Sequence, residues 1–304
     1  MHSFIKPKLW AAIRNAHGEE SQRFEFENGV LTAYAAKINV LSFKLGHLKK
    51  RVRIVGLPPS ISLPGYHAEN ASGIREITDW VKTQKGHTLI LNADDAFDGI
   101  FQKVSTLPSV VLKNTFKDFE AYVATMRSHY RYRLIKAKKR FKDVEIIDAP
   151  DFDASLYALY EAVYERSEYP LVKNTQAFFT AFPGYITAFY AKGKPIGFCQ
   201  YHIDDDVLYF MFCGLCYDAL KTYDTYLNLL MLIVERGIEA GVKTINFGQT
   251  TETIKMKLGG ELTPLNLYYY HDNALVRTIM KPIVPLLGYS THTYHFHVFK
   301  NLGE

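Results

Sequence analysis

The order of the elements between residues 185 and 247 constrains the fold more than any other feature of this chain. Three strand-like stretches follow one another at 185–191, 196–203 and 207–213, separated by short turn sequences. Residues 223–240 then repeat apolar side chains at spacings of three and four, which is typical of an amphipathic helix, and 243–247 is again a short apolar strand. This order predicts a mixed sheet, mostly antiparallel, with a helix packed on it.

The first part of the chain shows a similar order. Strands are expected at 23–26 and 30–43, a helix at 70–85, a buried strand at 87–92 and a short strand at 110–112. A basic helix at 116–140 and a strand at 144–147 follow. We therefore expect two related α/β lobes, residues 1–149 and 150–275, each a mixed, mostly antiparallel sheet flanked by helices. The tail, residues 276–304, is expected to pack on this body.

Composition indicates the broad class of protein. The chain has 304 residues, 48% hydrophobic and 22% charged, as expected of a soluble globular protein. A formal charge of +5 is too small to point to nucleic acid by itself, and no DNA-binding motif accompanies it. The presence of three cysteines predicts a reducing, cytoplasmic location, and no signal-peptide pattern or bilayer-length apolar run is expected.

The strands that end near Cys213 and Phe247 are joined by the long helix, so they are expected to run parallel. If they diverge at their ends, they leave backbone groups that can pair with an extended, amide-bearing ligand. This arrangement resembles that of the GNAT acyltransferases. A phosphate would then lie at the start of the helix, near Thr222 and Tyr223, where N–H groups point outward.

Two motifs resemble one branch of that superfamily. Phe247-Gly248, Lys255, Gly259 and Pro264-Leu265 are similar to the closing motif of Fem-type peptidyltransferases and related tandem-domain GNAT-like acyltransferases. In the first lobe, Arg131, Lys136 and Ala137 are similar to the arginine-then-lysine-alanine helix of that group. The resemblance covers residues 107–270. It implies transfer of an acyl group from an acyl-CoA-type donor to an amine.

One departure leaves the donor open. The glycine-rich pyrophosphate loop of simple GNAT enzymes is missing, because residues 217–223 read Tyr-Asp-Ala-Leu-Lys-Thr-Tyr. Aminoacyl-tRNA therefore stands beside acyl-CoA as a donor, as in Fem-type synthesis of cell-wall (peptidoglycan) precursors. A non-catalytic protein of the same fold that binds a phosphorylated or lipid ligand is the third reading.

Lys255 is the first catalytic candidate. A fixed cation can stabilise the charge that develops on a carbonyl oxygen under attack by an amine. The alternative is a solvated lysine on a short surface helix, with Lys257 equally eligible. Gln249 is expected either to hydrogen-bond a substrate carbonyl or to cap the turn that follows it.

Asp94 and Asp95 follow the buried strand of the first lobe. One of them is expected to accept the proton of the attacking amine, and a helix cap is the alternative function of the pair.

The remaining candidates concern partners. Arg131, Lys136 and Lys139 belong to a run of seven cations and are expected to hold a phosphate-bearing ligand, CoA or tRNA; a solvated helix face is the alternative. No metal is expected. Residues 279–288 are apolar with basic neighbours, so they either dock on the body or touch a membrane surface.

Overall fold

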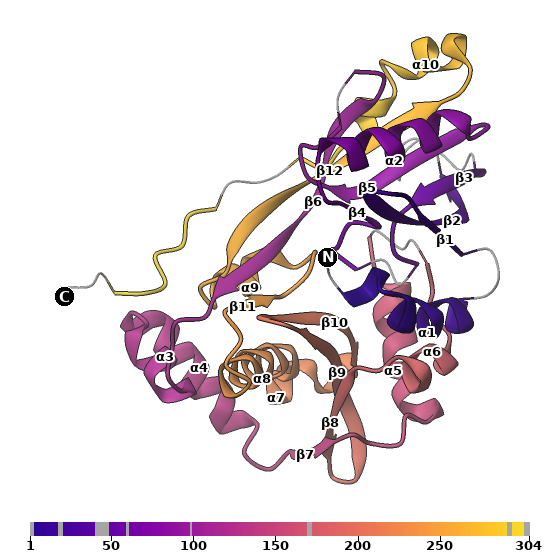
Figure 1. Ribbon diagram of the computed structural model, residues 1–304. Coiled ribbons are helices and arrows are strands. Elements are labelled where there is room, and N and C mark those ends of the chain that lie inside the picture. The colour runs from indigo at the N-terminus through magenta and orange to yellow at the C-terminus, as the bar shows by residue number, and fades with distance from the viewer. Residues whose placement is uncertain are drawn as a thin grey trace. The chain divides into compact units, whose positions relative to one another are not determined.

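The computed structural model describes residues 3–17, 21–39, 49–58, 61–97, 99–168, 172–290 and 294–300. The chain forms two compact units (Figure 1). Unit 1 contains Met1–Pro108, Leu171–Phe182 and Pro264–His292, and unit 2 contains Ser109–Pro170, Pro183–Thr263 and Thr293–Glu304. Strands β6 (Gln102–Lys113) and β12 (Glu261–His271) have residues in both units.

Unit 1 is built on a mixed sheet with the strand order β1-β2-β3-β5-β12-β6, and β4 also pairs with β2. Its strands besides β6 and β12 are β1 (Gln22–Glu25), β2 (Gly29–Asn39), β3 (Lys49–Val55), β4 (Tyr66–Ala68) and β5 (His87–Ala93). Strands β3 and β5 pair in parallel, whereas β1 with β2, β2 with β3, β2 with β4 and β5 with β12 pair antiparallel. Its helices are η1 (Ser3–Ile5), α1 (Pro7–His17), α2 (Ala71–Thr83), α6 (Gln176–Ala181), α10 (Ala274–Met280) and η2 (Val284–Leu287).

Helix α2 covers one face of this sheet (Figure 1). The side chain of Asn70 caps its start by accepting hydrogen bonds from the N–H groups of Ser72 and Gly73. Ile77 and Val81, four residues apart, are fully buried against strands β2 and β3. Gly86, with a φ of +81°, follows the end of the helix and turns the chain into β5.

Unit 2 contains the strand order β6-β11-β10-β9-β8-β7. Its further strands are β7 (Glu145–Asp148), β8 (Tyr185–Ala191), β9 (Lys194–Asp204), β10 (Val207–Leu215) and β11 (Thr244–Asn246). Its helices are α3 (Phe119–Thr125), α4 (Ser128–Arg140), α5 (Ala154–Glu165), α7 (Tyr217–Tyr223), α8 (Thr225–Glu239) and α9 (Glu252–Met256). The predicted mixed, mostly antiparallel α/β architecture is confirmed.

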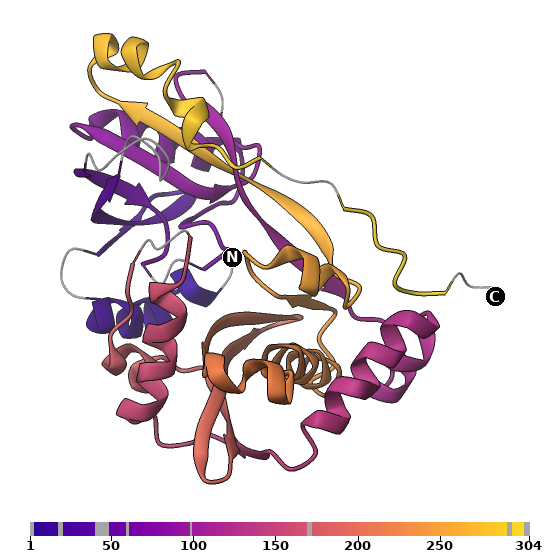
Figure 2. The same ribbon diagram turned by 180° about the vertical axis from the view of Figure 1, so that it is seen from behind.

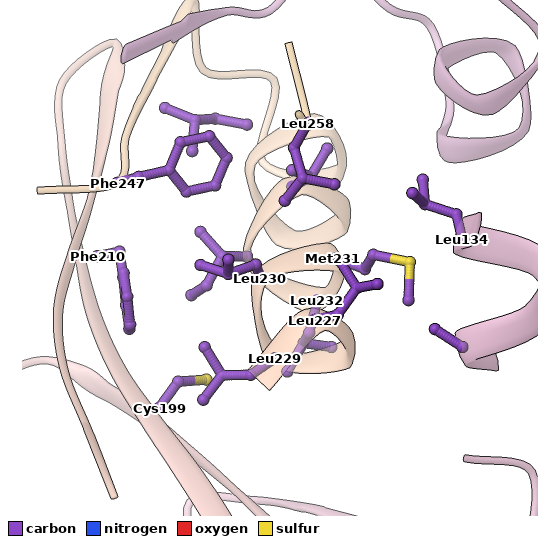
Figure 3. Close-up of a cluster of buried hydrophobic side chains, with 14 of the residues drawn as sticks. Leu134, Cys199, Phe210, Leu227, Leu229, Leu230, Met231, Leu232, Phe247 and Leu258 are labelled. Carbon is purple, nitrogen blue, oxygen red and sulfur yellow. The ribbon is translucent and has the colours of Figure 1, made fainter. Parts of the chain in front are cut away.

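Helix α8 forms the centre of the unit 2 core (Figure 3). Leu230 points from α8 toward Phe210 of β10 and Phe247, whereas Met231 points toward Leu134 of α4. Because α8 lies between the sheet and α4, its buried side chains occupy more than the single stripe expected of a surface helix. Each such leucine or methionine contributes about 1.5–3 kcal/mol through burial.

The basic segment expected as one helix is divided into α3 and α4, which lie side by side (Figure 2). Met126 separates them and adopts an extended conformation, with a ψ of 147°. It forms a β-bridge with Phe299 from the C-terminal tail, and the N–H of Arg127 donates to the carbonyl of Val298. The division therefore comes from a contact distant in sequence. Residues 294–300 belong to unit 2.

Helices α3 and α4 belong to unit 2, although residues up to 149 were expected in the first lobe. Leu134 and Ala137 of α4 are buried in the core around α8, and the Asn228 side chain of α8 donates to the carbonyl of Ala137 at 3.1 Å.

None of the helices in the described ranges combines the length and the apolar composition needed to cross a bilayer.

Candidate functional site

Strands β10 and β11 pair in parallel over only three residues each. The pairs run from Val207↔Thr244 to Tyr209↔Asn246. Beyond this point the chain after β11 bonds to β6: the N–H of Phe247 donates to Val110 at 2.9 Å, and Gly248 accepts from the same residue at 3.1 Å. Within the described residues, β10 therefore continues to Leu215 with a strand partner on its β9 side alone. The predicted divergence near Cys213 and Phe247 is present.

A β-bulge marks the same place on β10. The pairing with β9 shifts between Phe210 and Phe212. One extra residue reverses the alternation of side chains, so Phe210 before the bulge and Cys213 after it both contact the core around α8. Bulges re-aim side chains and interrupt pairing, and both effects occur here at the point where the two strands separate.

The loop after β11 has an unusual backbone. Gly248 has a φ of +71°, and Thr250 and Thr251 have φ values of +63° and +50°. Two consecutive β-branched residues in the left-handed region are strained, and such strain persists where surrounding contacts impose it. One contact is the 2.7 Å hydrogen bond between the hydroxyls of Tyr226 and Thr251, and another is the Asn246 side chain, which accepts from the Gly248 N–H at 2.8 Å.

Lys255 is buried, with 2% of its surface exposed, and lies on α9 directly after this loop. Its Nζ donates a 2.6 Å hydrogen bond to the main-chain oxygen of Gln249 and lies 6.0 Å from the centroid of the Phe210 ring. The alternative of a solvated surface lysine is therefore wrong for Lys255. An ammonium group has three N–H donors, so two remain beyond the recorded bond to Gln249.

Burial lowers the pKa of Lys255 from 10.5 to about 7, because the charged form loses its hydration. Cys213 and Glu252 oppose this shift. The pKa of Cys213 is raised to about 12 by burial, against the opposing effect of Lys255. The thiol is thus protonated near neutral pH, whereas the lysine exchanges between its charged and neutral forms there.

A pocket of about 290 Å³ opens on the outer side of α9. It is lined by Arg133 of α4 and by Thr251, Glu252, Thr253, Ile254 and Lys257. Helix α9 therefore carries Lys255 on its buried side, whereas Lys257, directly after the last residue of the helix, lines this pocket. The sequence analysis did not single out Arg133 as a residue beside α9. It identified a run of cations on α4, but such a run does not indicate which of its members faces α9.

The predicted phosphate-binding cations do not share one face of α4. Arg131 and Lys136 lie about 140° apart around the helix axis, at about 100° per residue. Lys136 and Lys139 are exposed, and Arg131 is half-buried. Two other cations of the run pair with acids of unit 2: Arg140 with Asp224 at 2.9 Å, and Lys138 with Glu235 at 3.8 Å. Binding of a phosphate by Arg131, Lys136 and Lys139 stays a prediction.

Thr222 and Tyr223 do not begin the long helix. They form the C-terminal end of α7, and α8 begins at Thr225 after Asp224, whose φ is +47°. Carbonyls rather than N–H groups are exposed at a helix C-terminus. One of them, the carbonyl of Tyr223, accepts from the Asn228 side chain at 3.0 Å. The expectation that these two residues offer N–H groups to a phosphate is therefore wrong.

Asp94 and Asp95 lie in unit 1 and are exposed. Asp94 accepts a 2.7 Å hydrogen bond from the Tyr66 hydroxyl. Asp95 pairs with Lys103 at 2.5 Å and accepts from Asn266 at 2.8 Å. The hydrogen bond and charge of Lys103 lower the pKa of Asp95, which makes it a weaker proton acceptor. The proton-relay role of the pair stays a prediction.

Comparison with known proteins bears on the fold. Residues 124–256 match the family model described as an acetyltransferase (GNAT) domain. This stretch of the chain is thus similar to a GNAT domain. Within it lie β10 with its bulge, helix α8, the strained loop and Lys255. No curated protein matches the sequence.

Solved structures extend the likeness beyond the GNAT domain. The C-terminal domain of a putative lysylphosphatidylglycerol synthetase from Agrobacterium fabrum aligns with a TM-score of 0.60 at 10% identity, covering 92% of each chain. L-PGS from Bacillus licheniformis aligns with a TM-score of 0.58 at 12% identity, covering 94% of this chain and 98% of the other. FemX aligns with a TM-score of 0.57 at 9% identity, covering 90% of this chain and 93% of the other. The predicted resemblance to GNAT-like proteins of the Fem type is confirmed at the level of the fold.

Proposed function

We propose that this protein transfers an acyl or aminoacyl group from an activated carrier to an amine, with Lys255 stabilising the transition state. The observation that carries the proposal is the buried Nζ of Lys255, which follows a strained loop at the point where β10 and β11 separate. Among the described residues no carboxylate is bonded to this buried cation, which makes its charge costly, so its retention points to a role in chemistry.

The proposed reaction begins with attack of a neutral amine on the carbonyl carbon of a thioester or ester. Negative charge then develops on the carbonyl oxygen, and the ammonium form of Lys255 donates a hydrogen bond to it. Such a donor lowers the barrier by about 3–4 kcal/mol. The intermediate collapses by breaking the bond to the carrier, which leaves as a thiol or an alcohol once protonated, and the amine loses its proton. Gln249 holds the lysine through its main-chain oxygen, and its side chain is proposed to contact the substrate carbonyl.

The carrier is proposed to be phosphate-bearing, because cations surround this part of the GNAT domain. Arg133 and Lys257 line the pocket beside α9, and Lys136 and Lys139 lie exposed on α4. Acyl-CoA is the first candidate for the carrier. Aminoacyl-tRNA is the second, and it is favoured by α7, which occupies residues 217–223 in place of a glycine-rich pyrophosphate loop.

A peripheral membrane contact is proposed for the edge of unit 1 formed by α10 and η2. Leu275, Ile279 and Leu286 are 69%, 57% and 54% exposed, and exposed Lys281 lies between the two helices. Val284 of η2 is fully buried, so the segment docks on unit 1 through one side and leaves apolar side chains on the other. This pattern fits a lipid surface and an acceptor or acyl chain that resides there.

The test combines ligand binding with turnover. Thermal unfolding is measured with acetyl-CoA, long-chain acyl-CoA and charged tRNA, since a donor at about 100 times its dissociation constant stabilises by about 2.7 kcal/mol. The stabilising donor is then supplied with candidate amines to the wild type, Lys255→Met and Lys243→Met. Lys243 is an exposed lysine that pairs with Asp206 and serves as the matched control.

We expect Lys255→Met to lower kcat by about 100-fold or more and Lys243→Met to leave it unchanged. Ligand binding retained without turnover by the wild type, for every donor and amine, would instead assign the fold to a binding protein. Full activity of Lys255→Met would exclude the proposed role of the lysine.

A further inference from the structure

Unit 1 contains a pocket that the proposed transferase reaction does not use. Its volume is about 410 Å³, within the range of small-molecule sites. It is lined by Gln22, Phe24, Ala33, Tyr34, Ala35, Arg51, Arg53, Trp80 and Gln84. All of these residues belong to unit 1, whereas Lys255 and the loop before it belong to unit 2.

The floor of this pocket is one face of three adjacent strands. Gln22 of β1 pairs with Ala33 of β2, and Ala35 of β2 pairs with Arg53 of β3. Residues directly opposite each other, and residues two apart along a strand, point to the same face. Phe24 and Arg51 therefore join this face. The central strand contributes two alanines, which leave space between the aromatic ring on one side and the guanidinium groups on the other.

The end of helix α2 forms the wall. The Trp80 ring lies with its centroid 4.7 Å from that of Phe24, at an interplanar angle of 50°. The Gln84 side chain donates to the carbonyl of Trp80 at 3.1 Å. Arg53 donates to the carbonyl of Lys85 at 3.4 Å, so its guanidinium lies beside the end of α2. Contacts among the lining residues thus position an aromatic pair and an arginine before any ligand arrives.

The lining has a definite chemical character. Among the described residues that line it are two arginines and no acidic residue, which favours an anion. Trp80 and Phe24 offer aromatic surface on which a planar ring can stack. The Gln22 carboxamide can donate and accept hydrogen bonds. The Gln84 N–H groups donate to Trp80 and Thr83, so its oxygen can accept a further bond, and together the two side chains suit the edge of a nucleobase. A carboxylate-bearing aliphatic ligand would use the arginines but leave the aromatic pair unused.

We propose that this pocket binds a nucleoside phosphate, with the base against Trp80 and Phe24 and the phosphate on Arg51 and Arg53. A free nucleotide and the terminal nucleotide of an RNA share this chemistry. The proposal does not depend on the transferase reaction.

Calorimetric titration of the full-length protein tests the proposal. The probes are AMP, UMP, adenosine, inorganic phosphate and a single-stranded RNA tetranucleotide at low salt. We expect the mononucleotides to bind at least about tenfold more tightly than adenosine or phosphate alone, because only they engage both parts of the pocket. Equal affinity for AMP and the tetranucleotide assigns the site to a free nucleotide, and tighter binding of the tetranucleotide assigns it to an RNA end.

Variants then locate the binding. Arg51→Ala and Arg53→Ala are each expected to weaken nucleotide binding by about tenfold or more, whereas Arg75→Ala, on an exposed arginine of α2, leaves it unchanged. Trp80 is one of two tryptophans, and Trp10 is buried, so the fluorescence change on binding should disappear in Trp80→Phe. Lys255→Met should bind nucleotide as the wild type does.

Three results would overturn the proposal. They are absence of nucleotide binding at millimolar concentration, phosphate binding as tightly as AMP, and binding that neither arginine variant weakens. An aromatic carboxylate such as benzoate that binds more tightly than AMP would likewise replace the nucleotide as the ligand.

Discussion

The Nζ of Lys255 donates a hydrogen bond to the main-chain oxygen of Gln249 at 2.6 Å. The bond joins α9 to the strained loop after β11 and fixes the position of a buried amine. Because the carbonyl is neutral, it orients the ammonium without neutralising it. The charge of Lys255 is therefore kept at a cost in stability, and that cost can be measured.

The first prediction concerns stability as a function of pH. The folded-state pKa of Lys255 is lowered to about 7 from 10.5, so between these values the unfolded state binds more protons than the folded state. The free energy of unfolding therefore rises with pH in this window, by up to about 1.4 kcal/mol per pH unit. Below pH 7 both states are protonated and the full cost of burying the charge is present.

Lys255→Met lacks this titration. The free energy of unfolding of both proteins is measured with denaturant from pH 6 to 9.5. The value for the wild type minus the value for the variant should be constant up to about pH 7 and increase above it. Lys243→Met, at an exposed position, should follow the wild type apart from a constant offset. A difference that stays flat across the range would show that Lys255 titrates normally in the folded protein.

The second prediction concerns the backbone of the loop. Thr250 is exposed and has a φ of +63°, which costs a β-branched residue about 1–2 kcal/mol. Glycine relieves this strain but has more freedom in the unfolded chain, worth about 0.5–1 kcal/mol. Thr250→Gly should therefore stabilise the fold by about 0.5–1 kcal/mol, measured by chemical denaturation.

The matched control for this substitution is Thr253→Gly in α9. Its helical backbone gains nothing from glycine, so this variant should lose about 0.5 kcal/mol. Destabilisation by both variants would contradict the left-handed conformation of Thr250.

Much of the structure of residues 124–256 could be predicted from the sequence because its signals are local. Strand β8 was predicted with both its ends, and α8 within two residues at its start, from turn residues and a regular apolar repeat. The division between α3 and α4 could not be predicted in the same way. It depends on Met126 pairing with Phe299, far along the chain, and nothing in the local sequence reports that contact.

The candidate site was predicted only in part. The spacing between Gly248 and Lys255 indicated a lysine after a strand, but its burial depends on Phe210 and on the loop backbone, which composition does not show. Strand β3 was missed because its cationic residues, including Arg51, hide a short alternation with Val52 and Ile54. Arg51 and Arg53 of this strand line the unit 1 pocket. Because the strand was not predicted, the pocket was not predicted either.

The third prediction concerns the membrane surface. Ile279→Glu places a charge among the exposed apolar residues of α10 and should weaken binding to vesicles containing phosphatidylglycerol by tenfold or more, since one buried isoleucine contributes about 1.5–3 kcal/mol. Ile146→Glu is the control, because Ile146 is 47% exposed on β7 of unit 2. Cosedimentation measures both. Equal binding by the wild type and Ile279→Glu would remove this edge from any membrane contact.

The fourth prediction concerns the contact between the C-terminal tail and Gly259 of the closing motif. Gly259 has a φ of +90°, and a Cβ there would lie 2.3 Å from two ring atoms of Phe299. Gly193, in the turn between β8 and β9, has a φ of +72° with open space around it. Gly193→Ala should therefore cost about 1–2 kcal/mol for its backbone alone, and Gly259→Ala a further 1–3 kcal/mol for overpacking.

The double variant Gly259→Ala/Phe299→Ala separates these two costs. Removing the ring should recover the overpacking part, so the coupling energy of the cycle should be at least about 1 kcal/mol. A Gly193→Ala/Phe299→Ala cycle should show none, because no Phe299 atom lies near Gly193. Coupling near zero in the first cycle would mean that the tail does not pack on Gly259 in solution. In that case the tail would not hold the end of α9, and the position of Lys255 would depend on the loop and the core alone.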